Sequence, residues 1–457
     1  MKRIIARLDI KGENVIKGVH LEGLKIVGNP KILSKKYSDE GADEIFFHDT
    51  VASLYRRNNL FKLIEEIASQ INIPLTVSGG IRSIKDIENA LISGADKVSL
   101  NTIFHENIKL IKESIKTFGS QAIVASVEAK RKNNKWLAFT DNGRSNTNKD
   151  LLEWISFLQN EGVGELLVTS VDYEGTKKGF DNNLLIELNK IVKIPLIISG
   201  GFGNIEDVKK AYQYKAVTGT AIASIIHFDE INIKTIKKNI DDNFILSKNF
   251  SIKKKIKKLS ILNTKTCNIR SLYNSLIKIC DVEVVDNLNL KKIDRLVLPG
   301  VGSFGAFSKE IANENKEKIK NLYSNSKPIL GICLGAQFLF TRSFEFEENM
   351  GLNLIKGDVI KINNIKDNKD IVTPNIGWWE IEESSDKLFL NIPKDSKYYF
   401  IHSYNFYPID QSIVLSKIKN LNINAICKKN NLVACQFHPE KSGKNGLKFL
   451  DNFLNYY

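Results

Sequence analysis

The sequence predicts two α/β domains, a (β/α)8 barrel over residues 1–245 and a Rossmann-like open sheet over residues 259–457, joined by a polar linker at residues 246–258. Two observations predict this arrangement. In the first half, short apolar runs alternate with helical patterns of roughly ten to fifteen residues, as parallel strands with crossover helices require. In the second half the alternation is less regular, which is typical of an open sheet. A chain of 457 residues that is 42% hydrophobic can bury two such cores.

The first half contains eight apolar runs that we interpret as the barrel strands. Helical patterns such as Leu60–Gln70 and Ile84–Ser93 fall between them. Eight alternating units over about 250 residues fit a (β/α)8 barrel. The eight predicted strands are Ile4–Leu8, Glu44–Phe47, Leu75–Val77, Lys97–Leu100, Ile123–Val127, Glu165–Val168, Leu196–Ile198 and Val217–Ala223.

An internal repeat supports the barrel and predicts that it consists of two fused halves. Ile73–Gly80 (IPLTVSGG) recurs 121 residues later as Ile194–Gly201 (IPLIISGG). Ala6–Lys11 (ARLDIK) recurs 119 residues later as Ala125–Lys130 (ASVEAK). Self-similarity at a nearly fixed offset is the signature of duplicated structural units.

The repeat places Asp9 and Glu128 at equivalent positions, where the first and fifth strands end. These strands face each other across the mouth of a barrel, where active sites of this fold lie. Two opposed carboxylates can serve as general acid and general base. A single aspartate at such a position more often caps a turn, but a pair related by the repeat favours a catalytic role.

Glycine pairs end the third and seventh strands, at Gly79–Gly80 and Gly200–Gly201, and small polar residues end the next strand in each half, at Asn101–Thr102 and Ala223–Ser224. Small residues let backbone amides approach an anion, and barrels often bind phosphate in such loops. A lone glycine pair usually marks only a turn. Its recurrence predicts two phosphate sites on opposite sides of the mouth, and therefore a bisphosphorylated or similarly two-ended substrate.

The second half is predicted to begin its sheet with Ser260–Leu262, to continue it with Leu296–Leu298, and to carry the reactive residue after Ile329–Ile332; Lys397–Tyr404 is predicted as a further strand. Cys333 follows the third of these runs, between Gly331 and Gly335. Small residues around one reactive residue suit a sharp strand-to-helix turn, which exposes the side chain and places it over helix amides that favour a thiolate. A buried structural thiol is the plainer interpretation of such a cysteine, and two distant segments argue against it.

Those two segments supply the partners that a nucleophilic cysteine needs. Ala434–Glu440 (ACQFHPE) offers His438 as a base and Glu440 as the acid that orients it. Leu298–Gly305 (LPGVGSFG) offers a glycine-rich turn whose amides can stabilise an oxyanion. The set of Cys333, His438 and Glu440 resembles that of the class I (triad) glutamine amidotransferases, which hydrolyse glutamine and deliver the ammonia elsewhere.

Composition excludes several other classes. The formal charge of +14 comes from lysines scattered through amphipathic patterns, apart from the cluster Lys253–Lys258 in the linker, so we expect neither nucleic acid nor a membrane as a partner. The five cysteines, at 267, 280, 333, 427 and 435, form no CxxC pair, so no zinc site, no disulfide framework and no cofactor are expected. The N-terminus does not read as a signal peptide and no apolar run reaches transmembrane length, so we expect a cytoplasmic protein.

The resemblance extends over nearly the whole chain. Residues 1–240 resemble the cyclase subunit of imidazole glycerol phosphate synthase, in segments that include RIIARLDIKG, IPLTVSGGIRS, GADKVSLNT, TSVDYEGTKKGFD and IPLIISGG. Residues 257–457 resemble the glutaminase subunit of the same enzyme. Ammonia in that family passes from the glutaminase through the barrel axis.

The resemblance assigns roles to individual residues. The barrel's catalytic pair falls on Asp9 and Glu128. In the glutaminase half, the amides of Gly302 and Leu334 would hold the oxyanion, and Gln337 would hold glutamine. The implied phosphate-binding positions are Lys17, Gly80, Asn101, Thr102, Gly175, Gly201 and Ser224. The implied charged gate at the bottom of the barrel is Arg3, Glu44, Lys97 and Glu165.

Four positions depart from the family. Glu128 and Glu174 stand where aspartate is usual, and each adds one methylene at the barrel mouth, where ångström-scale shifts can change rates strongly. In the glutaminase half, Asn375 replaces a basic residue and Trp379 replaces asparagine. With the segment KGVHLEGLK at Lys17–Lys25, these changes resemble a paralogous group that accompanies bacterial surface-polysaccharide genes.

The sequence therefore supports two candidate functions. In the first, the chain joins ammonia to the phosphoribulosyl formimino carboxamide ribonucleotide of histidine biosynthesis. In the second, it supplies ammonia to a partner enzyme that amidates a surface sugar. A third class, a scaffold without turnover, conflicts with the intact Cys333–His438–Glu440 set.

Overall fold

The computed structural model describes residues 2–20, 22–50, 60–241, 257–264, 268–369 and 371–457, and the isolated residues 244, 250 and 254. The chain forms two compact units, one of residues 1–115 and 120–246 and one of residues 116–119 and 247–457. Cys267 and most of the 246–258 segment, including most of the Lys253–Lys258 cluster, lie outside the described residues. None of the described helices is long and apolar enough to cross a membrane.

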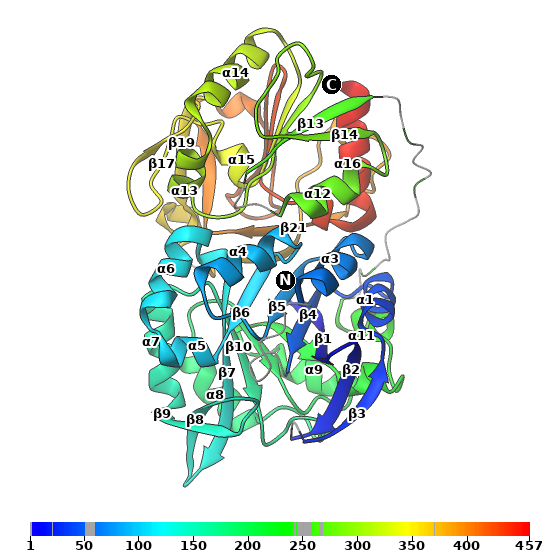
Figure 1. The fold of residues 1–457 in the computed structure, drawn as a ribbon, viewed down its shortest axis with the longest axis vertical. Helices are drawn as coiled ribbons and strands as arrows, with labels where there is room; N and C mark the ends of the chain where they lie inside the picture. The colour runs from blue at the N-terminus through cyan, green and yellow to red at the C-terminus, as the bar shows by residue number, and fades with distance from the viewer. Residues whose placement is uncertain are drawn as a thin grey trace. The chain divides into compact units, whose positions relative to one another are not determined.

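The first unit, blue to green in Figure 1, is a closed barrel of eight parallel strands, as the sequence predicts. Each strand pairs with its neighbours along the chain, and the last pairs with the first, Arg3 opposite Gly219. The strands are β1 (Arg3–Lys11), β4 (Glu44–Asp49), β5 (Leu75–Ser78), β6 (Lys97–Leu100), β7 (Ile123–Lys132), β10 (Glu165–Ser170), β11 (Leu196–Ser199) and β12 (Val217–Ile222).

Helices surround the barrel, and local sequence fixes where they begin and end. The Asp150 side chain accepts hydrogen bonds from Leu152 and Glu153 amides at the start of α7, and Gly162 ends that helix with a φ of 97°. The helices are α1 (Pro30–Asp39), α3 (Leu60–Gln70), α4 (Ile84–Ile92), α5 (Thr102–Glu106), α6 (Lys109–Phe118), α7 (Leu151–Glu161), α8 (Asn182–Ile191), α9 (Ile205–Ala211), α10 (Ser224–His227) and α11 (Ile233–Ile240), with a 3-10 turn at Ser120–Ala122.

Alternation along the strands divides the barrel interior into three layers. A charged layer of Arg3, Glu44, Lys97 and Glu165 lies at the amino ends of the strands. Above it lies an apolar layer, and above that a polar layer in which Arg7 contacts Thr169 and Ser199. The apolar layer consists of Ile5, Phe46, Val124, Leu167, Ile197 and Ala221.

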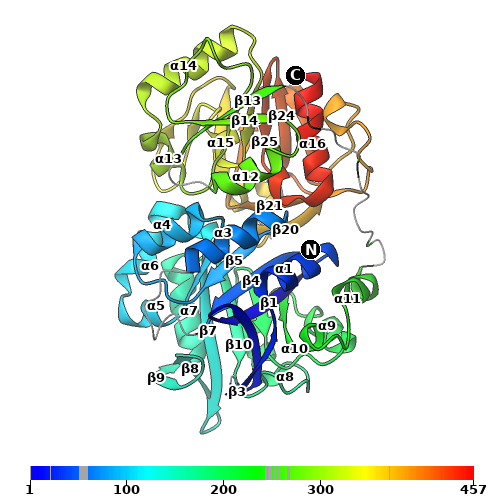
Figure 2. The same ribbon diagram turned by 45° about the vertical axis from the view of Figure 1, so that its right-hand side comes forward.

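Two hairpins that the sequence analysis did not predict extend from the carboxyl end of the barrel. β2 (Asn14–Val19) and β3 (Glu22–Gly28) continue β1, and β8 (Lys135–Thr140) and β9 (Ser145–Asp150) continue β7. Figure 2 shows β3 and the β8–β9 pair at the same end of the barrel. The hairpins thus follow the same symmetry as the repeat, because each extends the strand that carries Asp9 or Glu128.

The second unit contains a seven-stranded mixed sheet in the order β14-β13-β15-β16-β25-β24-β23. The first five strands pair in parallel, whereas β24 pairs antiparallel with both β25 and β23. Their bounds are β13 (Lys258–Leu262), β14 (Asp281–Val285), β15 (Leu296–Leu298), β16 (Ile329–Ile332), β23 (Val414–Lys417), β24 (Asn424–Lys429) and β25 (Leu432–Cys435). This confirms the predicted class of an α/β open sheet. The predicted strand Lys397–Tyr404 lies outside it: Lys397–His402 pairs with Asn375–Glu380, and Tyr404 begins the next strand, which belongs to a smaller sheet.

Helices cover both faces of this sheet. α12 (Ile269–Leu276) and α16 (Gly443–Tyr456) pack on one apolar cluster, and α13 (Phe304–Glu310) and α14 (Asn313–Ser324) pack on another. The remaining elements are α15 (Leu334–Gln337), a sheet of β17 (Arg342–Ser343), β18 (Asn349–Met350), β19 (Gly357–Lys361) and β22 (Tyr404–Pro408), a pair of β20 (Asn375–Glu380) and β21 (Lys397–His402), and 3-10 turns at Ile362–Asn364, Lys366–Asn368, Lys387–Phe389, Gln411–Ile413 and Pro439–Lys441.

Candidate functional site

Cys333 lies at the turn between β16 and α15, with φ 50° and ψ −107°. Residues other than glycine rarely adopt a positive φ, and such strain concentrates at functional sites. The glycines beside it are sterically required. A Cβ at Gly335 would lie 2.0 Å from the Leu298 carbonyl oxygen, and one at Gly331 would lie 2.6 Å from the Ala336 Cα. Gly331 and Gly335, from which the turn was predicted, are therefore the residues whose lack of a side chain lets the turn pack.

β25 brings the predicted base and acid next to this cysteine. Ile332 pairs with Cys435, and the Cys333 amide donates to the Cys435 carbonyl at 2.7 Å. The chain after β25 then places His438 and Glu440 in the same buried region, with His438 Nδ1 2.7 Å from Glu440 Oε1. A base oriented through one ring nitrogen is the arrangement that nucleophile activation needs.

Electrostatics favour a charged imidazole at this position. Burial alone would lower the pKa of His438, but the neighbouring Glu440 carboxylate and the Cys333 side chain outweigh burial, and the pKa lies well above the usual value. The Cys435 thiol, by contrast, has its pKa raised well above the usual value by burial. Of these two neighbouring cysteines, only Cys333 faces a base.

Gln337 reaches the thiol through a second glutamine. Its Nε2 donates to Gln436 Oε1 at 3.1 Å and to the Tyr404 carbonyl at 2.9 Å, and Gln436 Nε2 lies 3.4 Å from Cys333 Sγ. Gln436 was not among the predicted site residues. Its position within the ACQFHPE segment, two residues before His438, was the available signal.

The two amides predicted to hold an oxyanion come from different segments: Gly302 lies in the glycine-rich turn between β15 and α13, and Leu334 begins α15. Gly302 has a φ of 116°, and the Leu334 amide donates to the Gly300 carbonyl oxygen at 3.4 Å. That bond is long, beyond the usual range for N–H···O. Exchanging it for a bond to a developing oxyanion would cost little.

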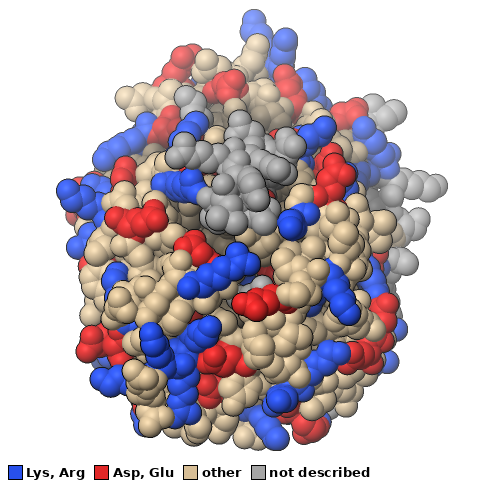
Figure 3. Space-filling model, turned by 60° about the horizontal axis from the view of Figure 1, so that its bottom comes forward, with Lys and Arg blue, Asp and Glu red and all other residues tan. Residues whose placement is uncertain are grey.

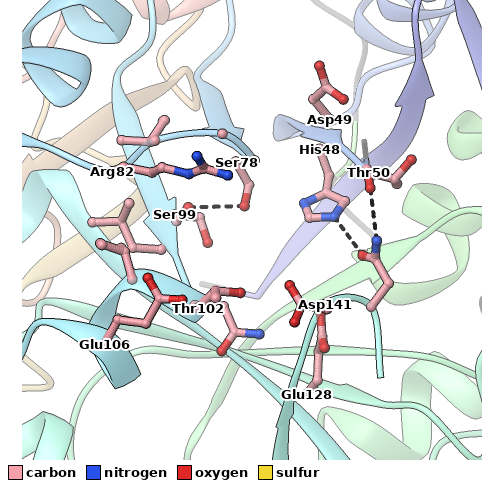
Figure 4. Close-up of a pocket in the computed structure, with 17 residues that line it drawn as sticks. His48, Asp49, Thr50, Ser78, Arg82, Ser99, Thr102, Glu106, Glu128 and Asp141 are labelled. Atoms are coloured by element: carbon pink, nitrogen blue, oxygen red, sulfur yellow. Dashed lines mark hydrogen bonds between the residues drawn. The ribbon is translucent and has the colours of Figure 1, made fainter. Parts of the chain in front are cut away.

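One side of the barrel mouth contains a cavity of about 480 Å³. Glu128 and the predicted phosphate-binding residues Gly80, Asn101 and Thr102 line it; we call it the open side. Figure 4 shows Glu128 and Asp141 pointing into the cavity from one wall, with His48 and Thr50 on another. On the surface around the mouth, basic and acidic side chains are interspersed (Figure 3).

The environment of Glu128 gives this carboxylate an unusual titration. Burial raises the pKa of Glu128 to about 7, even though the Gly143 amide donates to its Oε2 at 2.7 Å. His48 hydrogen-bonds Asn142 Oδ1 through Nε2 at 3.1 Å, and burial lowers its pKa. Near neutral pH the open side therefore offers one carboxyl group that can both give and accept a proton.

The other side of the mouth has a pocket of only about 10 Å³, lined by Gly175, Gly201, Ser224 and Glu174; we call it the closed side. Lys17, a further predicted phosphate ligand, forms an ion pair with Glu174 and a longer one, at 3.4 Å, with Asp9. The structure thus separates the predicted phosphate residues into one open and one closed group. Lys17 lies in the buried ion network beside the closed group.

Arg7 is a residue of the mouth that the sequence analysis did not assign a role. Its Nε donates to Asp9 at 2.9 Å, and its Nη1 donates to Thr169 at 3.0 Å and Ser199 at 3.1 Å. Burial opposes ionisation of Asp9, but Arg7 and Lys17 outweigh it and hold the pKa of Asp9 well below its usual range. The available signal was the repeat itself, which pairs Arg7 with Ser126.

The four predicted gate residues meet in a closed ring at the amino end of the barrel. Arg3 and Lys97 each bond both Glu44 and Glu165, with Arg3 Nη1 3.0 Å from Glu44 and Lys97 Nζ 2.8 Å from the same carboxylate. All four side chains are fully buried. Two cations and two anions compensate one another, as buried charges require.

No group of three or more histidine, cysteine or acidic side chains among the described residues is arranged to hold a metal ion. The fold and the sites together define a class: a glutamine amidotransferase domain joined to a cyclase-type (β/α)8 barrel in one enzyme. A family model for histidine biosynthesis proteins matches residues 3–232, and one for class-I glutamine amidotransferases matches residues 251–456. The chain belongs to the histidine biosynthesis protein family, with a class-I amidotransferase domain following the barrel.

Individual relatives match the barrel. The imidazole glycerol phosphate synthase subunit HisF of Legionella pneumophila is 52% identical over 206 residues, which is 45% of this chain and 97% of the relative. The proteins of that name from Clostridium botulinum and Sulfurisphaera tokodaii are 43% and 42% identical over 239 and 253 residues. These matches cover 52% and 55% of this chain, and 94% and 98% of the relatives.

Proposed function

We propose that this enzyme hydrolyses glutamine at Cys333 and passes the ammonia through the barrel to a phosphorylated acceptor at its mouth. The observation that carries the proposal is the buried His438–Glu440 pair at 2.7 Å beside a cysteine held in a strained turn. Cys333 attacks the amide carbon of glutamine, and His438 gives a proton to the departing ammonia. Water then releases glutamate, with His438 as the base.

The gate ring and the opposed carboxylates give the ammonia a route and a destination. Ammonia would enter where Arg3, Glu44, Lys97 and Glu165 meet, and would react at the end that carries Asp9 and Glu128. Glu128 would exchange the proton, because its pKa of about 7 lets it act in both directions. Asp9 would stay ionised and stabilise positive charge that develops on the acceptor.

The first candidate acceptor is the histidine-pathway ribonucleotide. The relatives named imidazole glycerol phosphate synthase subunit HisF support it, as do the glycine-rich loops on both sides of the mouth. Its test is turnover of that ribonucleotide by the purified enzyme with glutamine, or growth of a histidine auxotroph that carries the gene. Absence of cyclase activity beside a working glutaminase would contradict it.

The second candidate is ammonia supply for amidation of a surface sugar by a partner enzyme. The observation that favours it is the closed side, where the Lys17–Glu174 ion pair stands at a predicted phosphate position. Co-purification with a sugar-amidating enzyme, and glutamine-dependent amidation in the reconstituted pair, test this candidate.

The glutaminase assignment is tested by Cys333→Ala. We expect glutamine hydrolysis to fall by at least about 10³-fold, because the nucleophile is lost. Activity with added ammonium should persist, because the acceptor chemistry lies in the other domain. Cys427→Ala is a matched control, since Cys427 is also buried but lies on β24, away from His438. Near-normal glutamine turnover by Cys333→Ala would disprove the assignment.

A further inference from the structure

The Gln436 side chain contacts the nucleophile of the amidotransferase domain. Its Nε2 lies 3.4 Å from Cys333 Sγ, and this sulfur is the partner of Nε2 among the residues that the structure describes. Gln436 is fully buried, and Cys333 is only 5% exposed. The roles assigned above to Cys333, His438 and Glu440 make no use of this contact.

Asn405 fixes which end of the Gln436 amide faces the sulfur. Asn405 Nδ2 donates to the Asn424 carbonyl at 2.8 Å, and its Oδ1 accepts from the Asn424 amide at 2.9 Å, so backbone partners determine the orientation of this side chain. The same Nδ2 lies 3.2 Å from Gln436 Oε1. Because Nδ2 can only donate, the Gln436 atom that faces it must be the carbonyl oxygen.

Gln337 adds a second, independent constraint. Its Nε2 donates to the Tyr404 carbonyl at 2.9 Å, which identifies this atom as the amide nitrogen, and it also donates to Gln436 Oε1 at 3.1 Å. The Gln436 oxygen thus accepts two N–H groups. Only the nitrogen of that amide is left to face Cys333, so the contact with sulfur is an N–H···S hydrogen bond.

The main chain holds the donor and the sulfur in one register. The Gln436 amide donates to the Ala425 carbonyl of β24 at 2.9 Å, and the Cys333 amide donates to the Cys435 carbonyl at 2.7 Å. The backbone of Cys333 is therefore bonded to the residue that directly precedes Gln436. The amide donor is already in place at the thiol, as preorganised stabilisation of charge requires.

We propose that Gln436 is a further catalytic residue, which donates a hydrogen bond from Nε2 to the Cys333 sulfur and stabilises negative charge there. This role rests on the proposed glutamine hydrolysis, in which the sulfur carries charge twice. Before attack, the bond favours the thiolate over the thiol, because a hydrogen bond to a charged acceptor is the stronger one.

The second charged state arises when the acyl group leaves. Water adds to the carbon of the γ-glutamyl thioester while His438 takes its proton. The C–S bond then breaks, its electron pair returns to the sulfur, and glutamate departs with its carbonyl restored. The Gln436 N–H receives this returning charge. A neutral amide does so without competing with His438 for a proton.

Alkylation of Cys333 tests the role without glutamine. The full-length enzyme is treated with iodoacetamide, and the rate at Cys333 is followed by peptide mass spectrometry, which separates this site from the other cysteines. Gln436→Met removes the donor and keeps the side chain unbranched. At about pH 6.5 we expect this variant to be alkylated about tenfold more slowly than the wild type, the scale of one hydrogen bond to a charged group. The same substitution at the exposed Gln411 should leave the rate unchanged.

The pH dependence distinguishes charge stabilisation from a packing defect. At about pH 9.5 thiols ionise without help, and a thiolate that lacks a hydrogen bond is intrinsically the better nucleophile. The deficit of Gln436→Met should therefore shrink to less than about threefold or reverse. His438, with Glu440 beside it, and Cys435 also act on charge in this region and are the same in both proteins. A deficit below about threefold at the lower pH, or an equal loss at both pH values, would overturn the proposal.

A second variant keeps the proposal falsifiable if Gln436→Met does not fold. Gln436→Asn keeps a buried amide but withdraws it by one methylene, and it should show the same deficit at the lower pH. In glutamine hydrolysis, the kcat of the folded variant should fall by about tenfold, whereas KM should change by less than about threefold, because Gln436 contacts the sulfur. A loss confined to KM would contradict this role.

The two proposals fail separately. Near-normal glutamine turnover by Cys333→Ala would disprove the glutaminase assignment, and the alkylation rates would still report whether Gln436 acts on the sulfur. Equal alkylation of wild type and Gln436→Met would remove the role of Gln436 and leave the glutaminase assignment intact.

Discussion

The two sides of the barrel mouth carry the same loops, but their carboxylates have opposite electrostatic environments. Glu128 on the open side has no ion-pair partner within 4 Å among the described residues, and burial raises its pKa to about 7 although the Gly143 amide and the Asn101 side chain donate to it. Asp9, near the closed side, contacts Arg7 and Lys17, and its pKa is held well below the usual range. Duplication therefore conserved the position of two acids while their neighbours gave them different chemistry.

The largest expected effect comes from removing the acid on the open side. Glu128→Gln should lower the barrel's ammonia-dependent activity by about 10²-fold or more, the usual scale for a lost general acid or base. Glutamine hydrolysis by the other domain gives the internal control. An activity of Glu128→Gln close to that of the wild type would contradict the proposed difference in role between Glu128 and Asp9.

The conservative change at the same position separates the two candidate acceptors. If the enzyme turns over the histidine-pathway ribonucleotide, Glu128→Asp should preserve or raise its rate, because the aspartate restores the length usual in the family. If the acceptor differs, Glu128→Asp should bring no gain with that ribonucleotide. Steady-state cyclase assays on wild type and variant side by side decide between these outcomes.

A smaller effect on stability follows from the raised pKa of Glu128. An acid with a folded-state pKa near 7 and an unfolded value near 4.5 stabilises the fold fully only below pH 4.5 and loses that contribution as the pH rises through 7. Glu128→Gln should therefore gain stability over the wild type between pH 5 and pH 8, by up to about 3 kcal/mol. Thermal unfolding of the variant and the wild type at pH 5 and at pH 8 measures this difference in stability. The same substitution at the exposed Glu153 should show no such trend.

The smallest expected effect concerns communication between the domains. Coupling of the two domains would keep ammonia from being released when no acceptor is bound. We therefore expect ribose 5-phosphate, bound on the open side, to raise glutamine turnover several-fold in the wild type. Thr102→Ala should require more ligand for the same response, and Ser224→Ala should not. A glutaminase rate that is indifferent to the ligand would argue against coupling through the open side.

Sequence patterns predicted the elements whose periodicity is strong. The eight barrel strands are largely buried and short apolar runs mark them in the sequence, and the boundaries of the helix Leu60–Gln70 match its apolar pattern. The β2–β3 hairpin escaped prediction because Glu22–Gly28 is largely exposed and lacks an alternating apolar pattern. Hairpin pairing there depends on the strand β1 beside it, which local sequence does not encode.

The candidate site was predictable to the extent that its residues lie in short motifs. His438 and Glu440 are two residues apart, and the sequence related Asp9 to Glu128 through the repeat. The closed side was not predictable, because its ion network joins residues at positions 7, 9, 17 and 174, brought together only by barrel closure. The two phosphate sites expected from the repeat, one on each side of the mouth, stay a prediction.

The backbone conformation of Cys333 lowers the stability of the fold, and the thiol does not compensate for that loss. A φ of 50° with ψ −107° is a conformation that glycine adopts freely and that costs other residues about 1–3 kcal/mol. Cys333→Gly would relieve that cost at the moment it destroys the nucleophile. Two selective pressures therefore oppose each other at position 333 of the amidotransferase domain. Glycine would give the more stable fold, whereas a working enzyme needs cysteine.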